Sequence, residues 1–134
     1  MVKTISEAVR EGSLVFKPWL KSFSPERFEV DFSNVVSGRV NPDYLDPVKF
    51  FELTYITQRM KDVLESTLVR TVGLNDRGIV YLATGFGGGK SHLLTLLYHV
   101  FRSRKVPSEY ILREIDLDEV PNVKVVTIDG KNLE

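Results

Sequence analysis

The sequence "TGFGGGKSHLL", from Thr84 to Leu94, places three consecutive glycines directly before a lysine, a serine and a leucine-rich stretch. A short apolar run, "IVYLA" (residues 79–83), precedes it, and a wide apolar helical pattern follows it. Buried strand, glycine loop and helix, in this order, are the setting that a phosphate-binding P-loop requires. The stretch therefore predicts the beginning of a nucleotide-binding fold.

The residue types in this loop suit the recognition of phosphate groups. Glycines leave room for backbone N–H groups to surround a phosphate and accept positive φ angles. The helix beginning near Lys90 points its positive dipole end at the anion, Lys90 can reach the β- and γ-phosphates, and Ser91 can ligate Mg²⁺. The expected cofactors are ATP and Mg²⁺, with Lys90 as the catalytic residue. The expected cofactor-binding residues are Thr84, Gly85, Phe86, Gly87, Gly88, Gly89, Lys90, Ser91 and His92.

The loop departs from the usual P-loop pattern at one position. The pattern G-x-x-x-x-G-K-[ST] wants glycine where this chain has Thr84, and Gly85 is expected to supply the turn instead. The competing interpretation is a glycine-rich linker with a chance lysine and serine. Phe86 either touches a neighbouring subunit and shields the phosphates, or folds onto its own domain. His92 is expected near the α-phosphate, whereas His99 is expected to be a partly buried structural histidine.

Composition excludes several classes of site. The chain has 134 residues, no cysteine, and 18 basic against 18 acidic side chains. A thiolate metal site and a cysteine nucleophile are therefore excluded, and charge-driven nucleic-acid binding is unsupported except at a local patch of Arg102, Arg104 and Lys105. That patch is interpreted as a solvated helix end. Neither a signal peptide nor an apolar run long enough to span a membrane is present, which predicts a cytoplasmic protein without membrane partners.

The elements expected around the loop define an α/β fold. We expect a P-loop NTPase-like parallel sheet with flanking helices, formed by strands at residues 79–83 and 123–129 and incomplete because such sheets usually have five or more strands. Further predictions are capped helices starting after Thr4, Asp46, Thr57 and Ser108, and a strand at residues 28–32. Residues 1–45 are predicted to form an irregular arm with one short helix, and residues 46–134 the start of the P-loop core, one domain overall. The arm is rich in aromatic residues, interpreted either as anchors or as a partner-binding surface: Phe16, Trp19, Phe23, Phe28, Phe32 and Tyr44.

A second acidic residue is needed to hold Mg²⁺ and to support hydrolysis. Asp129, at the end of "VKVVTID", is the candidate metal ligand beside Ser91. Alternatively this strand is an ordinary one and the acidic strand lies beyond residue 134. The second alternative is favoured because Gly130 follows where an acidic partner would often sit. The chain alone is therefore expected to bind nucleotide and to hydrolyse it little.

Three stretches resemble one protein family: "FKPWL", "DPVKFFELTYIT" and "VYLATGFGGGKSHLLTLLYH". The family comprises large archaeal and bacterial AAA-like ATP-binding proteins catalogued as domain of unknown function four-nine-nine. Its members are often encoded near DNA methyltransferases and helicases in islands that resemble anti-phage defence systems. The resemblance implies that Thr84 is the family's own variant of the loop.

Two functions follow as alternatives. The first is binding of Mg²⁺·ATP through a Walker A loop, as the N-terminal part of an AAA-like ATPase. The second is a non-hydrolysing interaction module that docks on a partner chain completing the ATPase sheet. The partner is expected to be the remainder of a larger ATPase or a second copy of the chain, since unfinished sheet edges favour association.

Overall fold

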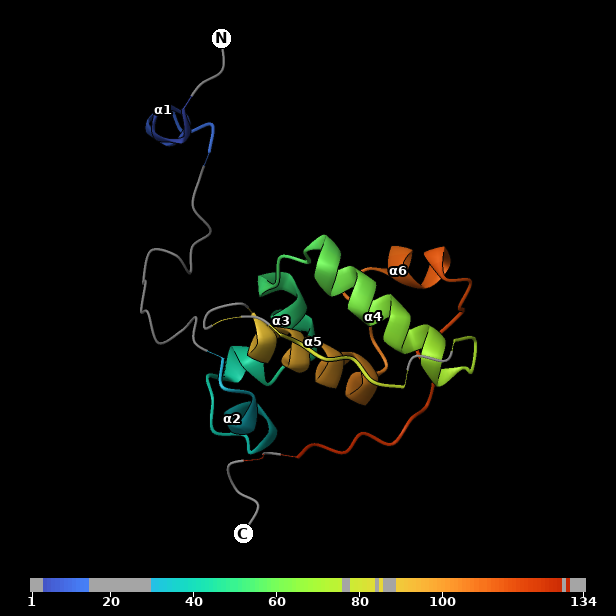
Figure 1. The fold of residues 1–134 in the computed structure, drawn as a ribbon. Helices are drawn as coiled ribbons and strands as arrows, with labels where there is room; N and C mark the ends of the chain where they lie inside the picture. Colours follow the sequence, from blue (N-terminus) through green and yellow to red (C-terminus); the bar gives the residue numbers. More distant parts are fainter. Residues whose placement is uncertain are drawn as a thin grey trace.

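Helices form the regular structure of the part of the chain that can be described. The computed structural model describes residues 4–14, 30–75, 78–83, 85, 89–128 and 130. The elements follow in this order: α1 (Ile5–Arg10), α2 (Phe32–Val36), the 3₁₀ helix η3 (Pro42–Tyr44), α3 (Pro47–Leu53), α4 (Gln58–Thr71), α5 (Lys90–Ser103) and α6 (Glu109–Glu114) (Figure 1).

Side-chain caps set the starts of the helices that the sequence predicts. Thr4 and Glu7 form a reciprocal capping box at α1, with the Thr4 backbone N–H donating to Glu7 at 2.8 Å. The hydroxyl oxygen of Thr57 accepts from the backbone N–H of Met60 at 3.3 Å, and the Ser108 hydroxyl caps α6 in a similar way. The predicted break before Thr57 and the predicted starts of these helices are confirmed.

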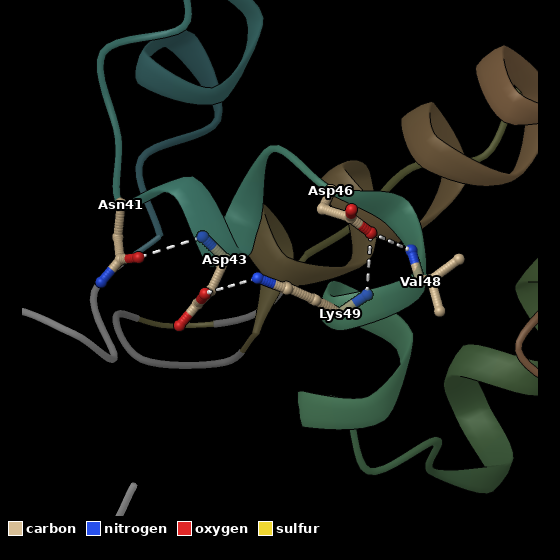
Figure 2. Close-up of polar contacts among 5 residues, drawn as sticks. All are labelled: Asn41, Asp43, Asp46, Val48 and Lys49. Atoms are coloured by element: carbon tan, nitrogen blue, oxygen red, sulfur yellow. Dashed lines mark hydrogen bonds and ion pairs between the residues drawn. The ribbon is translucent and has the colours of Figure 1, made fainter.

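Two further caps fold the chain between residues 41 and 49 into a tight double turn (Figure 2). The Asn41 side chain accepts from the Asp43 N–H at 3.0 Å and starts η3. One oxygen of Asp46 accepts from the N–H groups of Val48 and Lys49, at 2.9 and 3.1 Å, and starts α3 as predicted. The Lys49 ammonium then lies 3.8 Å from Asp43, which links the second turn back to the first.

Helix α5 is the centre of the packing. It contacts α2 and α3, while α4 contacts α6; Figure 1 draws α4 and α6 above α5 and α2 below it. Six of its fourteen residues are buried, which fits the wide apolar face of its sequence. The buried core draws on α3, α4, α5, α6 and the segment after α6, and its fully buried side chains include Phe50, Leu64, Leu68, Leu96, Val100 and Val120.

Phe50 of α3 occupies the middle of an aromatic stack. Its ring is fully buried and lies 4.7 Å from the ring of His92 and 5.1 Å from the ring of His99, both on α5. The ring of Tyr44 packs against it at 5.9 Å. The Nε2 atom of His99 donates to the backbone carbonyl of Tyr44 at 2.7 Å, so His99 is a structural histidine as predicted. The stack joins η3 and α3 to α5.

The predicted parallel sheet is wrong, because no described residue lies in a strand. Residues 79–83 and 123–128 carry no helix, yet neither segment is paired in a β-ladder. A strand exists only where a neighbour takes up its N–H and C=O groups, and no described segment does so here. A strand buried on both faces is predicted at residues 79–83, but Ile79 and Tyr81 are 89% and 88% exposed. In the second segment Val123 and Val125 pack on the core while Val126 and Ile128 are exposed.

The predicted strand at residues 28–32 is also wrong in its described part. Phe32 begins α2, because the Asp31 side chain accepts from the Ser33 N–H at 2.9 Å and caps a helix there. Of the aromatic residues in the predicted arm, Phe32 packs edge-to-face on Tyr98 at 5.9 Å and Tyr44 is buried. Both contacts agree with anchoring. The arm's other aromatic residues lie outside the described residues: Phe16, Trp19, Phe23 and Phe28.

The aromatic stack makes the stability of the fold sensitive to Phe50. Replacing Phe50 by alanine leaves a cavity beside the two histidines, and we expect the free energy of unfolding to fall by about 3–5 kcal/mol. Urea unfolding followed by circular dichroism measures this loss. Tyr55→Ala is the matched control, because the Tyr55 side chain is 86% exposed and its removal should cost about 0.5 kcal/mol or less. Equal effects of the two substitutions would contradict the central place of Phe50.

The two histidines also predict a pH dependence. Burial lowers the pKa of His92, and burial lowers the pKa of His99 against smaller opposing effects of the Tyr44 carbonyl and Asp46. The folded state therefore binds fewer protons than the unfolded state, where the histidine pKa is near 6.5. The contribution of the two histidines to the free energy of unfolding should therefore be complete above this pH and should decline as the pH falls below it.

Urea unfolding at about pH 7.5 and about pH 5.5 measures that decline. A His92→Gln, His99→Gln double variant is the control, and its stability should change less over the same interval. Glu65, whose pKa burial raises, acts in the opposite direction and is shared by both proteins. If the parent chain gained stability on acidification relative to the double variant, the lowered pKa values of the two histidines could not be the cause of the pH dependence.

Candidate functional site

Gly89 shapes the junction between the glycine loop and α5. It is the N-cap residue of α5 with a φ of +75°, a left-handed conformation that glycine adopts without strain. An added Cβ would meet no atom within 4 Å, so the backbone angle and not crowding calls for glycine here. Having no side chain, Gly89 gives the first N–H groups of α5 no side-chain cap. These donors and the positive dipole end of a fourteen-residue helix face the loop.

Lys90 turns back across the loop. Its Nζ atom donates to the backbone carbonyl of Gly85 at 2.9 Å, five residues earlier in the chain. The ammonium group therefore lies beside Gly85, at the end of α5 where the helix begins. A phosphate group there would meet this ammonium and the N–H groups of the helix start together.

Ser91 opens onto a cavity of about 440 Å³ at the same end of α5. Three parts of the chain meet around it: the first turns of α5, both ends of α2, and the end of the extended segment 123–128. Its described lining residues are Asp31, Phe32, Ser33, Val36, Ser37, Ser91, Leu94, Thr127, Ile128 and Gly130. The predicted metal ligand Asp129 lies outside the described residues, but Ile128 and Gly130 on either side of it border the cavity with Ser91.

His92 faces α3. Its Nε2 atom lies 2.9 Å from the hydroxyl oxygen of Thr54, whose own hydrogen is donated to the Phe50 carbonyl at 2.7 Å. Since that hydroxyl has one hydrogen to give, His92 is the donor and carries its proton on Nε2. Burial lowers the pKa of His92, which favours the neutral ring at pH 7. The imidazole therefore fixes the start of α5 against α3, and its predicted proximity to an α-phosphate stays a prediction.

The described residues account for only part of the predicted site. Gly85, Gly89, Lys90, Ser91 and His92 are gathered at the loop and the first turn of α5. The predictions for Thr84, Phe86, Gly87, Gly88 and Asp129 fall outside the described residues. Sequence reasoning missed Thr54 and Asp31 as neighbours of the site. Thr54 lies 38 residues from His92 and carries no motif, and the strand predicted at residues 28–32 hides the helix start at Asp31.

Two of the three basic residues at the far end of α5, Arg102 and Arg104, make contacts within the chain. The Arg104 guanidinium lies 2.9 Å from a carboxylate oxygen of Glu119 and donates to the Val120 carbonyl at 3.3 Å. Arg102 lies over the ring of Tyr98. Both contacts suit the interpretation of this patch as an ordinary helix end. Among the described helices, none combines the length and apolarity that crossing a membrane demands.

Comparison with known proteins places the chain in a family. Curated proteins give no match, and solved structures give none either. A family model described as the DUF499 N-terminal domain matches residues 20–133, which includes the glycine loop, α5 and both extended segments. This match spans most of the 134 residues. The chain therefore belongs to the DUF499 N-terminal domain family.

Proposed function

We propose that this chain binds the phosphates of Mg²⁺·ATP at the junction of the glycine loop and α5. The observation that carries the proposal is the Lys90 Nζ atom, held 2.9 Å from the Gly85 carbonyl above a helix start that no side chain caps. In this proposal the ammonium group and the backbone N–H groups of the first turn of α5 converge on the phosphates. Such convergence is how proteins without a large basic surface recognise a polyphosphate.

In this proposal each residue of the first turn has its own task. Lys90 exchanges its bond with the Gly85 carbonyl for bonds to phosphate oxygens. Ser91 supplies a hydroxyl ligand on the side of the cavity, where Mg²⁺ neutralises phosphate charge when it is bound. His92, held by Thr54, keeps the helix start in place. Hydrolysis needs further groups, so we propose that this chain binds nucleotide and turns it over little. A role within a larger AAA-like ATPase, and a link to DNA-directed or defence systems, come from the family resemblance alone.

Replacing Lys90 by alanine tests the proposal. The variant should remain folded, because the Lys90 side chain makes an exposed bond to the Gly85 carbonyl and is not part of the core. Its affinity for Mg²⁺·ATP should fall roughly tenfold or more, the loss expected when a charge-assisted hydrogen bond worth about 1.5–3 kcal/mol is removed. Isothermal titration with ATP, ADP and GTP measures the loss and the base preference together.

Lys105→Ala is the matched control. It removes the same charge beyond the other end of α5, about 20 Å away along a helix of fourteen residues. Its affinity for the nucleotide should stay close to that of the parent. Equal affinities of the parent and of Lys90→Ala for Mg²⁺·ATP would contradict the proposed role of Lys90 in phosphate binding.

A second candidate function is an interaction module, and the exposed apolar side chains favour it. Ile79, Tyr81, Val126 and Ile128 are between 71% and 89% exposed. Both extended segments end near the start of α5, so one covering partner could contact both of them. This candidate requires no nucleotide turnover, and it predicts that the isolated chain associates with itself.

Light scattering of the purified chain measures that association. Tyr81→Ser should lower the apparent mass toward that of the monomer, because it removes an exposed aromatic ring from an extended segment. Tyr55→Ser is the control, since Tyr55 is exposed to a similar degree but lies in the link between α3 and α4. A parent chain that is monomeric at high concentration would count against the interaction module and leave the nucleotide proposal standing.

A further inference from the structure

We propose that Asp31 supplies a carboxylate ligand for the Mg²⁺ that accompanies the nucleotide. The inference rests on the proposed function and adds a residue from a different part of the chain. Asp31 lies 60 positions before Ser91, yet both line the cavity of about 440 Å³ at the start of α5. Contact between α2 and α5 holds the two sides of the cavity together.

The chemistry of the cavity suits a hard cation. Among the described residues around it, oxygen-bearing side chains come from three segments: Asp31, Ser33 and Ser37 at α2, Ser91 on α5, and Thr127 near the end of the extended segment. Mg²⁺ prefers such oxygen ligands, takes one or two carboxylates, and keeps several of its waters.

Asp31 brings a negative charge to the cavity. It is the only ionisable side chain among the described residues that line the cavity. A carboxylate beside a polyphosphate site repels the ligand unless a cation lies between them. With Mg²⁺ present, the same carboxylate attracts the ion and strengthens binding. Asp31 should therefore make nucleotide affinity depend on Mg²⁺.

Asp31 also caps α2, and the two roles can be separated. One of its oxygens accepts from the Ser33 N–H at 2.9 Å. Asparagine caps helices about as well as aspartate, since its side-chain oxygen accepts the same bond. Asp31→Asn therefore removes the charge while keeping the cap. Asp46→Asn is the matched control, because Asp46 caps α3 in the same way and is not among the residues that line this cavity.

The experiment measures ATP affinity by isothermal titration, with Mg²⁺ and with EDTA, for the parent and both variants. For the parent, Mg²⁺ should strengthen binding. For Asp31→Asn this enhancement should fall by about 10-fold or more, since removal of even an outer-shell partner of a bound metal typically costs about 10- to 100-fold in metal affinity. In EDTA, Asp31→Asn should bind ATP at least as well as the parent. Asp46→Asn should behave like the parent in both buffers.

Two results would overturn the inference. One is an Asp31→Asn variant with the parent's full enhancement by Mg²⁺. The other is an equal loss of affinity with and without Mg²⁺, which would mark Asp31 as purely structural. Failure of the proposed function gives a different result. The parent would then bind no ATP, or Lys90→Ala would bind ATP as well as the parent does. Either outcome would also refute the role of Asp31.

Discussion

The ring of Phe50, in contact with both His92 and His99, fixes the orientation of α5 on which the rest of the structure depends. The two histidines are seven residues apart, two turns along the same face of the helix, so one buried ring contacts both. Phe50 can reach them because Asp46 and Pro47 start α3 one turn earlier. A local cap thus determines where a long-range contact forms. With that contact made, α5 can neither rotate nor slide without leaving a gap beside Phe50.

A fixed rotation of α5 assigns different directions to its first three side chains. Successive residues of a helix project about 100° apart. Lys90 turns back to the Gly85 carbonyl, Ser91 borders the cavity, and His92 bonds Thr54 at the C-terminus of α3. Each direction would be different if the helix were rotated by one residue. The candidate site is therefore a consequence of core packing as well as of the glycine loop that precedes it.

Local features of this fold can be predicted well from the sequence, and long-range pairing poorly. The caps at Thr4, Asp46, Thr57 and Ser108 are predictable because each bond joins residues two or three positions apart. The predicted strands are wrong, since pairing depends on a distant neighbour that the local pattern cannot reveal, and no described residue lies in a strand. Residues 79–83 carry the apolar side chains of a buried strand and nonetheless leave Ile79 and Tyr81 exposed.

The candidate site likewise contains some residues that the sequence predicts and others that it does not. The glycine loop, Lys90 and Ser91 stand together in the sequence, so a motif of adjacent residues is enough to identify them. Thr54 and Asp31 cannot be found in this way, because the packing of α3 and α2 on α5 brings them to the site. Asp31 is further hidden by its neighbours, whose alternating apolar residues suggest a strand, whereas its own side chain accepts from the Ser33 N–H and starts a helix.

The charges around the start of α5 are nearly balanced, and this balance limits what the site can bind. Burial lowers the pKa of His92 and favours its neutral form, so the positive charge of the first turn comes from Lys90 and from the dipole of the helix. Asp31, at the cavity beside Ser91, opposes it with a full negative charge. One ammonium and about half a charge from the dipole cannot neutralise a bare triphosphate and a carboxylate together. Under the proposed function, a polyphosphate is therefore accommodated best when it brings its own cation, and we propose the cavity beside Ser91 as the place where that cation finds oxygen ligands.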